Sequence, residues 1–278
     1  MRRRGRTLRG ARPLGRSQAA EARAPAPPGV AGLPLRPVEP ASAGAPRPGL
    51  ARSLAAWGVH AYTACGAVVA FLALRAIGED RFVDAFRWLA IALLIDCSDG
   101  ALARAVGVKR VLPWFDGTRL DDIIDYLTYV LVPVVLLHEA ALFPQGMATA
   151  CAAAPLLASA YGFCRTDAKT ADHYFRGFPS YWNVVAFYAF FLPLSPQATA
   201  AWVLGLSLLV FAPLRFLYPS RAPRLRGLTI TLGVAWALVL AVPVFVMPAA
   251  SRALVWASLA YPAYYLGTSL WLQFVGRD

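Results

Sequence analysis

The chain has 278 residues, of which 58% are hydrophobic and only 15% are charged. Ordinary globular chains are roughly 45–50% apolar with about 25% charged residues, so this composition excludes an ordinary soluble domain and predicts an integral membrane protein. The formal net charge is +12, and residues 1–50 hold ten Arg, nine Pro and only two acids.

Residues 1–50 have no apolar periodicity, so we predict that they form a disordered Arg/Pro/Ala-rich tail. The tail is expected to lie in the cytoplasm near anionic lipid headgroups. Nucleic-acid binding is only a generic property of such tails, and we expect no nucleic-acid partner.

Residues 51–278 are predicted to form one all-α transmembrane domain, a polytopic helical bundle of about eight helices. A bilayer core of about 30 Å needs about 20 apolar residues per helix. Eight segments approach that length: 54–76, 82–104, 117–142, 145–165, 178–195, 198–218, 228–248 and 253–275.

Lys and Arg residues are unevenly distributed among the loops. They gather after the second, fourth and sixth segments, for example at Lys109, Lys169 and Arg221, whereas the third and fifth loops carry none. The positive-inside rule therefore places both termini in the cytoplasm. We expect a multi-pass protein of the inner (cytoplasmic) membrane.

The second and third segments carry carboxylates at helical spacing. Asp96, Asp99, Gly100, Ala103 and Arg104 share one helix face, and Gly117, Asp121 and Asp125 share another. Measured from the outer ends of the two segments, Asp96 lies about 21 Å deep and Asp125 about 26 Å deep. The acids are thus expected at one depth, in the cytoplasmic leaflet, with Asp122 pointing away from them.

Carboxylates inside apolar helices are costly and indicate a functional site. Four of them brought together would repel one another, and hard divalent cations such as Mn²⁺ or Mg²⁺ would relieve this. The alternative, ion pairs with interfacial arginines, is plausible for one acid but not for four at these spacings. Gly100 and Ala103 leave a flat face on which a ligand can lie.

These residues resemble the signature of the CDP-alcohol phosphotransferases, D-x-x-D-G-x-x-A-R, a spacer, then G-x-x-x-D-x-x-x-D. All eight fixed positions are filled, and the resemblance covers residues 50–275. Six of the eight helices would correspond to the core of that family. The twelve-residue spacer, 105–116, and the block 169–183 are similar to its bacterial phosphatidylcholine synthase branch.

The resemblance implies a catalytic domain that transfers the phosphatidyl group of CDP-diacylglycerol to choline and releases CMP. Asp96, Asp99 and Asp121 would bind metal, and Asp125 would lie near a second ion and act as general base. CDP-diacylglycerol would lie along a set of positions in the first three helices: Gly100, Ala103, Arg104, Gly117 and, more weakly, Thr63. The site would open to the cytoplasm and to membrane lipid, and the family makes a homodimer plausible.

Choline carries a quaternary ammonium, which aromatic side chains bind. Tyr129 is four residues after Asp125 and so shares its face. Other candidates lie in or near the fourth loop: Tyr161, Tyr174, Tyr181, Trp182 and the acid Asp172. Aromatic residues also gather at membrane interfaces for other reasons, so each remains open to that reading.

Two other functions fit the composition. Another acceptor, such as serine, glycerol 3-phosphate or inositol phosphate, would use the same acids, and only the resemblance favours choline. An ion-coupled transporter would also use buried acids, but its site would be expected near the midplane on broken helices. Here the acids lie toward one interface.

Overall fold

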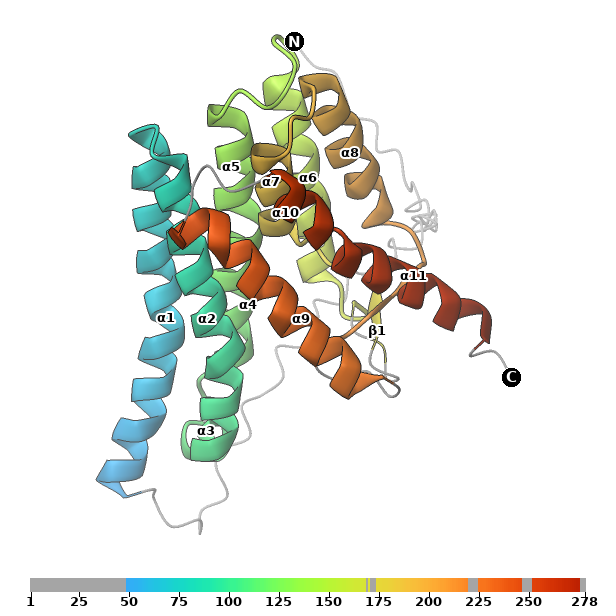
Figure 1. Cartoon of the computed structure of the whole chain (residues 1–278). Coiled ribbons are helices and arrows are strands. Elements are labelled where there is room, and N and C mark those ends of the chain that lie inside the picture. The colour runs from blue at the N-terminus through green and yellow to red at the C-terminus, as the bar shows by residue number, and fades with distance from the viewer. Residues whose placement is uncertain (1–48, 169, 171–173, 220–224, 247–251, 276–278) are drawn as a thin grey trace, which may run out of the picture. The chain divides into compact units, whose positions relative to one another are not determined.

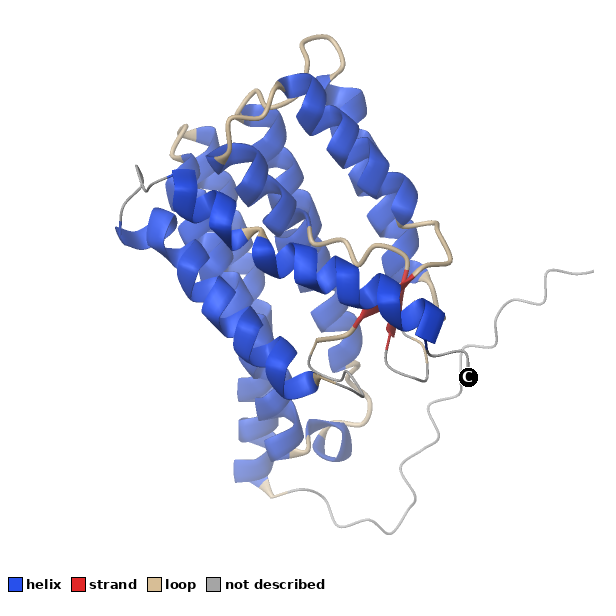
Figure 2. Ribbon diagram, turned by 45° about the vertical axis from the view of Figure 1, so that its right-hand side comes forward, coloured by secondary structure: helices blue, strands red, loops and turns tan. Residues whose placement is uncertain are grey.

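The computed structural model describes residues 49–168, 170, 174–219, 225–246 and 252–275. The predicted tail, apart from its last two residues, lies outside this range. The described residues form helices and one pair of short strands (Figures 1 and 2). The all-α prediction is therefore confirmed in its main point.

Two long helices begin the described chain. α1 spans Leu50–Gly78 and α2 spans Phe82–Val106, and they lie side by side along much of their length (Figure 1). Asp80, with a positive φ of 55°, turns the chain between them. α2 begins at the residue predicted, and both helices extend two residues beyond their predicted ends, while α1 begins four residues earlier than predicted.

The predicted spacer connects α2 to α4 through a short helix. Gly107 ends α2 in the left-handed region, with φ 72° and ψ 41°, which glycine adopts without strain. α3, Val108–Val111, follows. The side chain of Asp116 then accepts hydrogen bonds from the amides of the first turn of α4, Gly117–Asp125, and so caps that helix. The second half of the signature thus begins at a capped helix start.

The third predicted segment is one continuous helix of changing pitch. α4 runs directly into a π-helical stretch, Tyr126–Leu131, and then into α5, Val132–Glu139. Pro133 has no amide hydrogen to donate to the turn before it, and the wider turn accommodates this defect. A second π-helical stretch, Val242–Val246, has a proline, Pro243, within it rather than after it.

The predicted count of eight membrane-spanning helices is not confirmed. Among the described residues, two helical runs are long and apolar enough to cross a membrane: Leu50–Gly78 and Arg226–Val246, the latter made of α9 (Arg226–Ala241) and its π-helical end. α2 is long enough, at 25 residues, but carries five charged side chains.

The middle helices are shorter than predicted. α6 (Ala148–Cys164), α7 (Trp182–Phe191) and α8 (Pro196–Leu209) have 17, 10 and 14 residues, or about 26, 15 and 21 Å at the helical rise. Each is short of a bilayer core of about 30 Å.

A two-stranded antiparallel sheet replaces part of the predicted sixth segment. β1, Tyr174–Arg176, pairs with β2, Arg215–Leu217. Residues 210–218 were expected to continue the helix, but Pro213 has no amide hydrogen for a helical bond, and the chain turns and extends instead. The sheet thus joins the fourth loop to the end of the predicted sixth segment.

The last predicted segment is divided at Leu259. α10 spans Arg252–Ser258 and α11 spans Ala260–Val275. Pro262 cannot donate to the carbonyl of Ser258, which explains the break.

The main apolar core lies away from the acids. It joins the end of α1, the start of α2, α5 and α7, with buried members such as Ile77, Phe86, Leu136 and Tyr188. The acids lie at the other end of α2 and at the start of the α4 helix, so the core anchors these helices at a distance from the site.

Candidate active site

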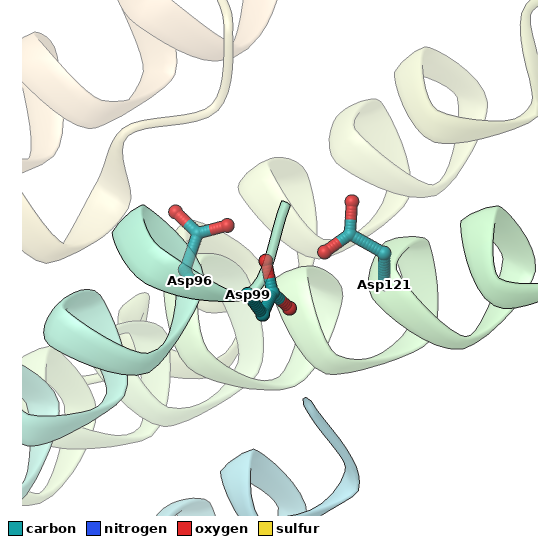
Figure 3. A group of neighbouring side chains, drawn as sticks. All are labelled: Asp96, Asp99 and Asp121. Atoms are coloured by element: carbon teal, nitrogen blue, oxygen red, sulfur yellow. The ribbon is translucent and has the colours of Figure 1, made fainter. Parts of the chain in front are cut away.

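Three carboxylates from two helices converge. Asp96 and Asp99 project from α2 and Asp121 projects from α4, and each offers an oxygen within 4.8 Å of the others (Figure 3). Asp99 is buried and the other two are half-buried. A donor set made only of carboxylate oxygens fits a hard divalent cation, so the predicted acid cluster could bind metal.

Two hydroxyl groups orient this triad. Thr63 on α1 donates a hydrogen bond of 2.7 Å to Oδ2 of Asp99. Tyr129, in the π-helical stretch, donates one of 2.7 Å to Oδ2 of Asp96. Such partners fix the direction of a ligating carboxylate. Sequence reasoning placed Thr63 and Tyr129 on the substrates, and did not foresee that both contact the acids.

Two glycines let α1 approach α4 closely. A Cβ at Gly66 would lie 2.4 Å from Cγ2 of Ile124, and a Cβ at Gly117 would lie 2.7 Å from Cε1 of His60. Gly117 is a signature residue, so its lack of a side chain has a direct steric reason. On the same helix as Gly66, Thr63 reaches Asp99 of α2.

The remaining signature residues lie along the end of α2. A Cβ at Gly100 would lie 3.4 Å from Nη1 of Arg104, so the guanidinium lies over Gly100. Ala103 packs beside α3 in a small apolar cluster with Val59 and Val108. On the face predicted for the nucleotide, Gly100 is thus covered by one cation, the guanidinium of Arg104.

Asp125 lies one turn beyond Asp121 on α4. It acts electrostatically on Tyr129 and Tyr181, as Asp96 also does, so it belongs to the same neighbourhood. For Asp122, the ion pair seen at Arg119 is with Asp116, at 3.5 Å. The prediction that Asp122 stands outside the site stays a prediction.

No family model matches the chain. It is, however, similar to curated proteins over most of its length. It is 39% identical over 216 residues to the phosphatidylcholine synthase of Pseudomonas aeruginosa, covering 78% of this chain and 91% of that protein. The chain belongs to the phosphatidylcholine synthase family.

Two further phosphatidylcholine synthases support the assignment. That of Borreliella burgdorferi is 34% identical over 227 residues, 80% of this chain and 96% of its own. That of Rhizobium meliloti is 42% identical over 184 residues, 66% of this chain and 76% of its own. The predicted family and branch are confirmed. The two long apolar helices agree with the predicted membrane location.

The aromatic residues predicted for the acceptor fall into two groups. The rings of Tyr129 and Tyr181 lie 6.3 Å apart, beside Asp96. Tyr265 of α11 continues the row, 6.4 Å from Tyr181, and donates to the carbonyl of Leu217. Sequence reasoning missed Tyr265, since only tertiary packing brings α11 to this place.

The other aromatic candidates have different surroundings. Trp182 has no exposed surface and donates to Ser159 in the core. Tyr161 stacks on Phe211, at 4.8 Å. Tyr174 lies in β1 and packs in one cluster with Tyr181. The predicted contributor Asp172 lies outside the described residues.

An ion cluster holds the loop between α6 and α7. Arg165 binds both carboxylate oxygens of Asp167, at 2.8 and 2.9 Å, and Arg176 of β1 donates to the same carboxylate at 2.7 Å. These charges, Arg165 first, lower the pKa of Asp167 from its ordinary 3.8 to about 2. The cluster fastens β1 to the start of the loop that leads to Tyr181.

Proposed function

We propose that this protein transfers the phosphatidyl group of CDP-diacylglycerol to choline, giving phosphatidylcholine and CMP. The carboxylate triad between α2 and α4 carries the proposal, because it occupies the signature positions in a member of the phosphatidylcholine synthases. An enzyme of this class needs a cluster of oxygen ligands to face a pyrophosphate, and the triad supplies one.

Asp96, Asp99 and Asp121 would hold Mn²⁺ or Mg²⁺, with Asp125 beside the second of two ions. Bound divalent cations would neutralise charge on the pyrophosphate and on the departing CMP. Thr63 and Tyr129 keep the carboxylates of Asp99 and Asp96 in place by their hydrogen bonds, so little reorganisation would be needed when substrate arrives.

Asp125 is our candidate for the general base. It takes the proton of the choline hydroxyl as the oxygen attacks the β-phosphorus. A new oxygen–phosphorus bond forms to choline, and the bond from phosphorus to the bridging oxygen breaks, so that CMP leaves with the electron pair. A base positioned in this way accelerates the step by about 10²–10⁴-fold.

The CDP group would lie along Gly100, Ala103 and Arg104, with Gly117 facing it from α4. Arg104, which lies over Gly100, offers a cation to a phosphate, and the imidazole of His60 lies against Gly117.

The choline ammonium would lie against the rings of Tyr129, Tyr181 and Tyr265. Aromatic faces attract quaternary ammonium ions, and these rings begin beside Asp96 and within electrostatic range of Asp125. Only two carbons separate the hydroxyl of choline from its nitrogen, so the base and the rings must be neighbours. The exposure of Tyr161 and the complete burial of Trp182 argue against these two, whereas Tyr174 packs in the same cluster as Tyr181 and Tyr265.

The membrane placement follows from loop charge. We place the protein in the inner membrane as a multi-pass protein, with both termini and the active site on the cytoplasmic side. Residues 1–50 would be a disordered tail and residues 51–278 the catalytic domain. A homodimer is our expectation from the family.

Purified protein supplied with CDP-diacylglycerol and Mn²⁺ tests the acceptor directly. Choline, serine, glycerol 3-phosphate and inositol phosphate are offered separately and the lipid products identified. We expect phosphatidylcholine alone. A reaction with serine or a phosphorylated acceptor, and none with choline, would refute choline as the acceptor.

Tyr181→Leu should raise the KM for choline by between about two- and thirtyfold, while Tyr181→Phe, which keeps the ring, should change it less.

A further inference from the structure

His60 on α1 carries a buried nitrogen without a partner. The residue is 6% exposed, and in the described part of the chain its Nε2 makes no hydrogen bond. Buried polar groups are nearly always paired, because an unpaired one costs about 1–3 kcal/mol. Unless a ligand bonds this nitrogen, the unpaired atom lowers the stability of the fold with no compensating interaction.

The position of His60 relates it to the signature residues. Thr63, three residues further along the same helix face, binds Asp99 of the triad. The imidazole lies against Gly117, where an added Cβ would be 2.7 Å from its Cε1, and against the ring of Phe115, 4.5 Å away. His60 is thus held between the acids and the spacer.

His60 lies on the nucleoside side of the acids. Going from Thr63 to His60 moves one turn toward the start of α1, and going from Asp99 to Ala103 moves one turn toward the end of α2. The adjacent Val59 packs in one cluster with Ala103. If the pyrophosphate lies at the triad, His60 is level with the group that extends along Gly100 and Ala103.

We propose that Nε2 of His60 hydrogen-bonds the nucleoside of CDP-diacylglycerol, at the cytosine edge or a ribose hydroxyl, and so contributes to recognition of the nucleotide. An imidazole nitrogen donates or accepts according to its tautomer, so both groups are within its chemistry. The inference rests on the proposed function, since it assumes that a cytidine nucleotide is the leaving group.

The test is equilibrium binding of CMP to the full-length protein in detergent with Mn²⁺. His60→Phe keeps a ring of similar size and removes the nitrogen, and it should weaken CMP binding by about tenfold. His60→Gln places an amide nitrogen near the position of Nε2 and should restore much of the affinity. Deoxy-CMP lacks the ribose 2′-hydroxyl, and UMP carries uracil in place of cytosine. If His60 bonds the ribose hydroxyl, deoxy-CMP should bind wild type and His60→Phe equally well. If His60 bonds the cytosine edge, UMP should do so.

Thermal unfolding without nucleotide separates this role from a structural one. Replacing an unpaired polar ring by an apolar one is nearly neutral or stabilising, so His60→Phe should unfold at the wild-type temperature or above. A clear loss of stability, or CMP binding by His60→Phe equal to wild type, would overturn the inference. If wild type binds CMP but does not react with choline, only the choice of acceptor is refuted. If wild type does not bind CMP, both the proposed function and the role of His60 are refuted.

Discussion

Asp125 is the residue on which the proposed proton transfer depends. It lies one turn after Asp121, on a helix that continues without a break into its π-helical stretch. Asp125→Asn keeps the shape and removes the base, so we expect kcat to fall by about 10²–10⁴-fold while CMP binding persists. Asp122→Asn is the matched control, and we expect near wild-type rates for it. Full activity of Asp125→Asn in the same assay would remove Asp125 from the mechanism.

Tyr129 supports the triad through Asp96. Tyr129→Phe removes the 2.7 Å hydrogen bond, and loss of such a partner commonly lowers metal affinity by about 10–100-fold. The Mn²⁺ concentration that gives half-maximal activity, and the Kd for Mn²⁺, should rise accordingly. Tyr126→Phe is the control, because its hydroxyl donates to the carbonyl of Leu156 and not to an acid. Equal Mn²⁺ dependence in the two variants would contradict this role.

At the scale of elements, the site depends on how closely α1 approaches α4. Gly66→Ala would place a Cβ 2.4 Å from Ile124, and such overpacking costs about 1–3 kcal/mol. The unfolding temperature in detergent should fall, and activity should fall with it because Thr63 moves away from Asp99. Gly58→Ala on the same helix meets no atom within 4 Å and should be neutral or stabilising. A wild-type unfolding temperature for Gly66→Ala would show that α1 and α4 are further apart.

The ion cluster at Asp167 predicts that the stability of the protein depends on pH. Its pKa is lowered to about 2 in the folded protein, so its contribution to stability is present above pH about 4 and is lost as the pH falls toward 2. The unfolding temperatures of wild type and Asp167→Asn should differ at pH 7 and converge near pH 2. Because the carboxylate is exposed, 1 M salt should also reduce the difference. If the unfolding temperatures still differ at pH 2, the charge of Asp167 is not the cause of the difference.

The sequence predicts the helices around the signature well and the later ones less well. α1, α2 and the α4–α5 run follow from long apolar stretches bounded by turn residues, and the acids follow from i+3 and i+4 spacing. The sheet of β1 and β2 depends on pairing between distant loops, which no local pattern contains. Likewise, the contacts of Thr63, Tyr129 and Tyr265 arise from packing between helices far apart in sequence.

At the scale of the whole molecule, the apolar surface agrees with a membrane location. Only 17% of the apolar window in Arg226–Val246 is buried, and side chains such as Leu238 and Val234 are more than half exposed. Surfaces of this kind are rare on soluble monomers and are suited to lipid. A lipid substrate can then reach the triad from the bilayer while choline reaches it from water, as the proposed reaction requires.

The central claim is that the protein joins choline to a phosphatidyl group and releases CMP in the same step. The most direct measurement is the amount of CMP and of phosphatidylcholine formed by the protein in vesicles that contain CDP-diacylglycerol and Mn²⁺. We expect equal amounts of both with choline and neither without it. CMP released at the same rate in the absence of choline, or no phosphatidylcholine in its presence, would contradict the account.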